Sequence, residues 1–269
     1  MAERSLHHLT MINKHPVQIA EAAAAGGFSH CGIRLVAPRA GDPLIDILKE
    51  PGGIVALGDR LTSLGIGLLD IEAVWLSETT NVADLYPAFE AGQRLGARYL
   101  LAVGNDPEPN RQHENFQALC EAAELYDLKV GLEFISYCQI NSLQKAADVV
   151  VKSGRSNAGL IIDSLQFFRS GMTPSDLTPE IAARVLYAQI CDARLEAPAT
   201  IDEKRFEARE DRLLPGDGEL PIRELMAALP PYIPMSLEAP TQTLKGASHF
   251  EVGTIAGAKM HAFLNSVGR

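Results

Sequence analysis

The sequence of 269 residues contains 34 acidic and 24 basic side chains, which gives a formal net charge of −10. This balance argues against a nucleic-acid partner, because binding to phosphates needs a basic surface. No apolar run reaches the roughly 18 residues that cross a bilayer, and the N-terminal MAERSLHHLTMINKH lacks the apolar core of a signal peptide. We therefore expect a soluble, cytoplasmic protein without a membrane partner.

Short apolar runs alternate along the chain with stretches of helical spacing. The apolar runs predict strands over residues 5–11, 31–37, 66–75, 97–104, 129–135, 157–163, 184–192 and 232–239. The spacing predicts helices over residues 16–26, 82–95, 111–126, 165–169, 179–184, 220–229 and 250–265, with others before residue 64 and from about residue 141. Pro16 suits a first helical turn, Gly96 a helix C-terminus, and Asn141 or Ser142 an N-cap.

These elements form eight strand–helix units. The strands are nearly continuous apolar runs, which is typical of parallel strands that are buried on both faces. Eight such units in about 250 residues predict an α/β fold, a (β/α)8 TIM barrel, as a single domain over residues 1–269. A doubly wound open sheet is the alternative, and it is disfavoured because neither GxGxxG nor GxxxxGK[ST] occurs in the sequence.

The segment 193–218 reads as a long, charged loop that ends in the turn-rich LLPGDGELP. Loops that follow strands face the active site of a barrel, so we expect this one to cover or line the site. The four cysteines form no CxxC pair, and we expect them to be reduced and packed in the core: Cys31, Cys120, Cys138 and Cys191.

Four polar side chains stand where apolar runs end: Glu133, Asp163, Gln189 and Glu238. A barrel brings the carboxyl ends of its strands to one mouth. Carboxylates that are crowded together repel one another unless a cation lies between them. Oxygen ligands of this kind favour a hard divalent ion, Mn2+ or Mg2+, with Co2+ or Zn2+ as alternatives. Any one of the four alone reads equally well as a strand-end residue that bonds to a loop, but the set of four predicts a metal site.

Five segments carry a resemblance to a known superfamily: GLEF at 131–134, IIDSLQFFRSG at 161–171, YAQICDA at 187–193, RLLPGDGELP at 212–221 and SLEAP at 236–240. They resemble the sugar phosphate isomerase/epimerase superfamily, the xylose isomerase-like barrels. The resemblance implies that one divalent ion is held by Glu133, Asp163, Gln189 and Glu238. Many members have His where this chain has Gln166 and Gln189, and glutamine as the third ligand is similar to the dehydroshikimate dehydratase branch.

The resemblance implies proton abstraction next to a carbonyl through a metal-stabilised enediolate, with Glu133 and Glu238 as acid and base. The leading hypothesis is a metal-dependent isomerase or epimerase of a sugar or a sugar-like hydroxy-ketone. The alternatives are a metal-dependent dehydratase, a lyase that acts on a cyclic hydroxy-ketone such as 3-dehydroshikimate or a keto-inositol, and a non-catalytic barrel that binds a small ligand. A metal endonuclease on this barrel is disfavoured by the net charge of −10. Barrels of this family often pair, which implies a homo-oligomer, a dimer or a tetramer.

Further residues are candidates for substrate binding: Gln166, Arg34, Glu72, His8, Arg209 and Arg212. Alternation along the first predicted strand directs one of His7 and His8 inward, and we take His8 as the one that contacts substrate. Arg34 is expected either to bind substrate or to pair with Glu72, because a buried arginine needs a partner.

The loop arginines and two neighbours of the strand ends complete the predicted site. Arg209 and Arg212 either hold an anionic group or are solvated charges of the loop. Asp192 follows Gln189 closely enough to orient a ligand or a basic residue from behind. Trp75 is expected either to form a wall of the pocket or to pack in the core.

Overall fold

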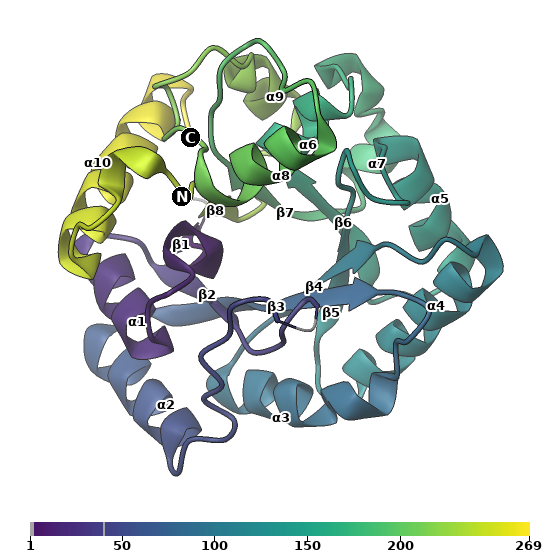
Figure 1. Ribbon diagram of the computed structural model, residues 1–269, viewed down its shortest axis with the longest axis horizontal. Coiled ribbons are helices and arrows are strands. Elements are labelled where there is room, and N and C mark those ends of the chain that lie inside the picture. Colours follow the sequence, from purple (N-terminus) through teal and green to yellow (C-terminus); the bar gives the residue numbers. More distant parts are fainter. Residues whose placement is uncertain (1–2, 40) are drawn as a thin grey trace.

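The computed structural model describes residues 3–39 and 41–269. Eight parallel strands close into a barrel in the order in which they occur in the sequence, and Figure 1 shows the helices arranged around them. The strands are β1 (Arg4–Leu6), β2 (His30–Arg34), β3 (Gly67–Leu76), β4 (Tyr99–Gly104), β5 (Lys129–Glu133), β6 (Ala158–Asp163), β7 (Val185–Ile190) and β8 (Met235–Leu237). The predicted (β/α)8 barrel is therefore confirmed.

The helices begin and end largely where local sequence signals place them. Pro16 lies in the first turn of its helix, Ser142 is the N-cap of another, and Gly96 ends a third with a φ of 80°. The helices are α1 (Pro16–Ala25), α2 (Gly53–Leu64), α3 (Tyr86–Leu95), α4 (Pro109–Glu124), α5 (Leu143–Ser153), α6 (Ser164–Arg169), α7 (Pro179–Ala182), α8 (Ile201–Glu210), α9 (Ile222–Ala228) and α10 (His249–Ser266). Short 3-10 helices are η1 (His8–Met11), η2 (Val82–Leu85), η3 (Pro174–Asp176) and η4 (Gln242–Leu244).

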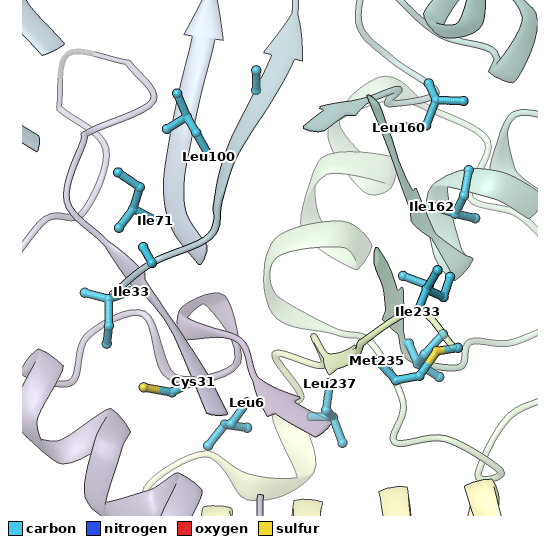
Figure 2. Close-up of a cluster of buried hydrophobic side chains, with 14 of the residues drawn as sticks. Leu6, Cys31, Ile33, Ile71, Leu100, Leu160, Ile162, Ile233, Met235 and Leu237 are labelled. Atoms are coloured by element: carbon cyan, nitrogen blue, oxygen red, sulfur yellow. The ribbon is translucent and has the colours of Figure 1, made fainter. Parts of the chain in front are cut away.

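The strands bury apolar side chains on both faces. In β4, Leu100 and Ala102 belong to the large apolar layer that includes helix side chains, whereas Leu101 and Val103 belong to a smaller cluster inside the barrel. Figure 2 shows part of the larger layer, with side chains from several strands directed away from the barrel interior: Leu6, Cys31, Ile33, Ile71, Leu100, Leu160, Ile162 and Leu237. Alternate positions therefore face inward, and the functional side chains follow this inward row.

The first and the last predicted strand are much longer than the strands that form. The strand predicted over residues 5–11 ends at Leu6, because the chain turns into η1, where the Thr10 N–H donates to the His7 carbonyl at 3.1 Å. The strand predicted over residues 232–239 covers only Met235–Leu237. Pro234 precedes it and cannot donate a backbone hydrogen bond to a ladder.

The prediction of an irregular loop over residues 193–218 was wrong in part, because helix α8 lies within it. Thr200 and Glu203 form a capping box at its start, in which each side chain bonds to the backbone N–H of the other. Only Ala208 of α8 is buried, so the helix carries no apolar stripe that a pattern search would find.

All four cysteines are buried free thiols, as the sequence predicts. Burial raises the pKa of each thiol, which favours the inert, protonated form. Within residues 3–39 and 41–269, no helix has the length and apolar character that crossing a membrane requires.

Candidate metal centre

Three carboxylates converge at the mouth of the barrel. Glu133 is the last residue of β5, Asp163 is the last residue of β6, and Glu238 directly follows β8. Each offers an oxygen that lies within 4.8 Å of the other two, and all three side chains are buried. They arrive together because parallel strands end at the same edge and because each stands on the inward row of its strand.

Burial and nearby charges change the proton affinity of two of these carboxyl groups, Glu133 and Glu238. Burial, followed by the nearby charges of Glu238 and Asp163, raises the pKa of Glu133 well above its usual range. Burial also raises the pKa of Glu238, with a further contribution from Asp163, although Arg212 acts in the opposite direction. A divalent cation would relieve this repulsion and displace the protons, since a carboxylate ligand must be ionised.

Gln189 lies beside the carboxylates on β7, where it is the ladder partner of Asp163 on one side and of Ser236 on the other. Its side chain is fully buried, and among the residues that the structure describes no donor reaches its Oε1 atom. A buried amide oxygen without a partner is costly unless something binds it. Three carboxylates with one amide oxygen form a donor set that suits a hard divalent ion, so the residues fit the predicted metal.

Arg212 is a buried part of this centre rather than a solvated charge of the loop. Its Nη1 lies 2.6 Å from Asp163 Oδ2 and 3.3 Å from Glu238 Oε2, and its Nε donates to the Ala208 carbonyl at 2.7 Å. Burial alone would lower the pKa of Arg212, but Asp163 and Glu238 raise it well above its usual range. The guanidinium is therefore a permanent cation at the edge of the carboxylate cluster.

A small cavity borders two of the three carboxylates, Glu133 and Glu238. The residues that line it include Glu133 and Glu238 together with five of the predicted substrate-binding residues and two aromatic side chains: Arg34, Glu72, Gln166, Arg209, Arg212, Trp75 and Tyr137. Tyr137, in the loop after β5, is a cavity residue that sequence reasoning missed. Its only signal is its position shortly after a strand end.

Arg34 and Glu72 line the cavity as a pair. Arg34 Nη2 donates to Glu72 Oε2 at 3.0 Å, and both side chains are buried. Arg34 was expected either to pair with Glu72 or to bind substrate. It pairs with Glu72 and also lines the cavity, so its position is compatible with both. Gln166 also has a fixed orientation, because its Oε1 accepts from the N–H and the hydroxyl of Ser136 at 3.2 and 3.3 Å.

Arg209 connects α8 to the loop that follows β2. Its Nη2 lies 2.9 Å from Asp42 Oδ1, and Arg39 pairs with the same carboxylate at 3.2 Å. The Arg39 guanidinium also lies over the Trp75 ring, 5.1 Å from its centroid. Trp75 therefore lines the cavity, and its ring is covered by Arg39, which shares the Asp42 carboxylate with Arg209.

The structure places His7, and not His8, in the inward position. His8 lies outside the cavity with both ring nitrogens engaged, because Nδ1 accepts from the Arg34 N–H at 2.8 Å and Nε2 lies 3.0 Å from the Lys14 carbonyl. Burial lowers the pKa of His8 to about 4. The inward ring of His7 lies 3.1 Å from Gln189 and 3.2 Å from Glu238. Alternate residues of a strand face the same side, and His7 lies two positions after Ser5 on the inward row. This spacing is the sequence signal that selects His7 over His8.

The Asp192 carboxylate has no hydrogen bond or ion pair with a metal-binding or basic side chain among the described residues. Its carboxylate instead accepts hydrogen bonds from the backbone N–H groups of Ala193 at 2.8 Å, Gly216 at 3.1 Å and Leu220 at 3.1 Å. Its own backbone forms an antiparallel bridge with Leu213, with both hydrogen bonds at 2.8 Å. Asp192 thus attaches the segment that carries Arg212 to the end of β7.

The sequence is similar to those of known barrel proteins. The xylose isomerase-like TIM barrel family matches residues 57–258, so the chain belongs to this family. The chain is 28% identical over 150 residues to an inosose isomerase of Bacillus licheniformis, a match that covers 52% of each protein. It is 26% identical over 145 residues to a 3-dehydroshikimate dehydratase of Pseudomonas aeruginosa, covering 52% of this chain and 22% of that protein. The chain thus spans about half the length of the inosose isomerase that it matches.

Solved structures share the whole fold at low sequence identity. A crystal structure of the IolI protein with a bound zinc atom has a TM-score of 0.81 and 19% identity, and covers 98% of this chain and 99% of that one. A D-allulose 3-epimerase of a Methylomonas species in complex with D-allulose has a TM-score of 0.73 and 16% identity, and covers 98% of this chain and 96% of that one. These likenesses concern the fold.

Proposed function

We propose that this protein is a divalent-metal-dependent isomerase or epimerase of a sugar-like hydroxy-ketone, with Glu133, Asp163, Gln189 and Glu238 as metal ligands. Three buried carboxylates lie within reach of one another beside Gln189, whose amide oxygen has no donor among the described residues, and this arrangement carries the proposal. The all-oxygen donor set favours Mn2+ or Mg2+. Such an ion supplies a Lewis acid that stabilises negative charge on a substrate oxygen.

Glu133 and Glu238 are the proposed acid and base. Both carboxyl groups line the cavity, where they can reach a carbon-bound proton of a substrate. One ionised carboxylate takes the proton from the carbon next to the carbonyl. Return of that proton to the neighbouring carbon gives an isomer, and delivery of a proton to the opposite face by the other carboxyl group gives an epimer. Gln166 does not titrate, so its NH2 group is proposed to bind a substrate oxygen instead.

The charges around the cavity favour a substrate without a phosphate group. Each arginine that lines the cavity already has a carboxylate partner: Arg34 pairs with Glu72, Arg209 with Asp42, and Arg212 with Asp163. A phosphate would have to compete with these buried or partly buried pairs, whereas hydroxyl groups can bond to the outer lone pairs and N–H groups of the same side chains. We propose a neutral polyhydroxy-ketone, and the partial match to inosose isomerases makes a keto-inositol the first candidate.

A dehydratase is the second candidate. Gln189 as a ligand and the partial match to a 3-dehydroshikimate dehydratase favour it. It requires the same proton abstraction, followed by loss of a β-hydroxyl group as water. The product then contains a conjugated carbonyl that absorbs in the ultraviolet, and isomerisation forms no such group.

The test is proton exchange in heavy water. Protein loaded with Mn2+ or Mg2+ is incubated with keto-inositols, ketohexoses and 3-dehydroshikimate, and deuterium on carbon is followed by NMR while absorbance is recorded. Incorporation without a chromophore supports the isomerase, and a rising chromophore supports the dehydratase. Glu238→Gln is expected to keep the ion, as elemental analysis will show, and to lose exchange. Metal-loaded protein that incorporates deuterium into none of these substrates contradicts the proposal, and full exchange by Glu238→Gln contradicts the role of that residue.

A further inference from the structure

The imidazole of His7 connects two of the proposed metal ligands. The ring is fully buried, with Nε2 3.1 Å from Gln189 Nε2 and Nδ1 3.2 Å from Glu238 Oε1. Asp70 Oδ2 lies 3.7 Å from Nε2, and Glu72 Oε1 lies 3.4 Å from Nδ1. His7 directly follows β1, the strand that pairs with β8, and no step of the proposed reaction uses it.

The contact between His7 and Gln189 determines which end of the amide faces the carboxylates. An amide has one carbonyl end and one NH2 end. The NH2 group lies against His7 Nε2, so this nitrogen is the acceptor, and the carbonyl oxygen at the other end of the amide has no donor among the described residues. The ring proton then belongs on Nδ1, from which it can be donated to Glu238 Oε1. The opposite tautomer, in which Nδ1 accepts from the Leu9 N–H, would place an N–H group against the NH2 group of Gln189.

We propose that His7 is a positioning residue of the metal centre, which turns the carbonyl oxygen of Gln189 toward the ion and fixes the carboxylate of Glu238. This inference rests on the proposed metal site. A neutral amide is the weakest donor of the set, and its alternative orientation would present N–H groups to a cation. Groups that orient ligands from behind are commonly worth about 10- to 100-fold in metal affinity.

The experiment is a calorimetric titration of chelator-treated protein with Mn2+, for wild type and for His7→Leu, His7→Gln and His7→Asn. His7→Leu removes both contacts and is expected to weaken Mn2+ binding about 10- to 100-fold. The longer glutamine side chain can place an oxygen near the former Nε2, so it should retain most of the affinity. The shorter asparagine reaches only the former Nδ1 and should bind Mn2+ more weakly than glutamine does.

A double-mutant cycle separates positioning from general damage to the fold. If His7 acts through Gln189, His7→Leu should weaken Mn2+ binding much less in a Gln189→Ala background than in wild type. Equal losses in both backgrounds, or a His7→Asn variant that binds as tightly as His7→Gln, would overturn the proposal. If His7→Leu does not fold, the comparison of glutamine with asparagine still decides. Wild-type protein that binds no Mn2+ would refute the metal centre itself, which is a distinguishable result.

Discussion

Replacement of Asp192 by alanine should destabilise the protein strongly, although this residue contacts neither the metal ligands nor the cavity. Its carboxylate accepts three backbone hydrogen bonds, from Ala193, Gly216 and Leu220. A hydrogen bond to a charged group contributes roughly 1.5 kcal/mol or more. Loss of all three therefore lowers the free energy of unfolding by about 4 kcal/mol, in the range of large single-residue effects.

The matched variant is Asp192→Asn, which keeps one carbonyl oxygen for Ala193 and Leu220 and turns an NH2 group toward the N–H of Gly216. It should lose about half as much stability, roughly 2 kcal/mol. Urea unfolding followed by circular dichroism measures both variants. The reasoning is wrong if Asp192→Ala unfolds within about 1 kcal/mol of wild type, or if asparagine is as damaging as alanine.

Three further predictions concern packing, protonation and substrate binding. Gly257→Ala should destabilise the protein by about 2 kcal/mol or more, because the new Cβ would lie 2.0 Å from the Gly26 carbonyl oxygen. Gly58→Ala in α2 is the matched control: its new Cβ has its nearest neighbour at 3.5 Å, so it should stabilise the protein by about 0.5–1 kcal/mol. Thermal unfolding measures both variants. The pKa of His8 is lowered from 6.5 to about 4 in the folded protein, so the unfolded chain binds the proton more tightly. The contribution of neutral His8 to the free energy of unfolding is therefore complete above pH 6.5 and is lost as the pH falls toward 4. His8→Asn should remove roughly 2 kcal/mol of the difference in unfolding free energy between pH 7.5 and pH 5, and an unchanged difference would contradict this assignment. Arg212→Met should retain one divalent ion per chain by elemental analysis and lose about 100-fold in kcat/KM, and an unaltered kcat/KM would exclude a role in substrate binding.

The barrel and its three carboxylates were predictable because their signals are local. A parallel strand that is buried on both faces is a continuous apolar run, and the polar residue that ends it stands at the mouth. Glu133, Asp163 and Glu238 follow from this rule alone. The position of Gln189 beside Asp163 follows from the same rule and from the ladder register.

The remaining features depend on contacts between distant segments. Arg212 reaches the carboxylates from a segment that bonds to Asp192 after β7 and to Pro240 after β8, and no sequence pattern encodes these contacts. The choice between His7 and His8 depends on where β1 ends, and strand ends are the least certain part of a pattern. Helix α8 has a capping box but only Ala208 buried, so its hydrophobic pattern is that of a loop.

The ring of strands is joined between β1 and β8, its two shortest members with three residues each. The join includes a hydrogen bond from the Thr10 hydroxyl to the Leu237 carbonyl, two groups that are 227 positions apart in the chain. Contacts over such separations form late in folding, because the entropy of closing a long loop opposes them. Glu238 and His7 directly follow these two strands. Pairing of β5, β6, β7 and β8 in chain order brings the four proposed ligands together, but His7 joins them only when β1 pairs with β8 and closes the ring.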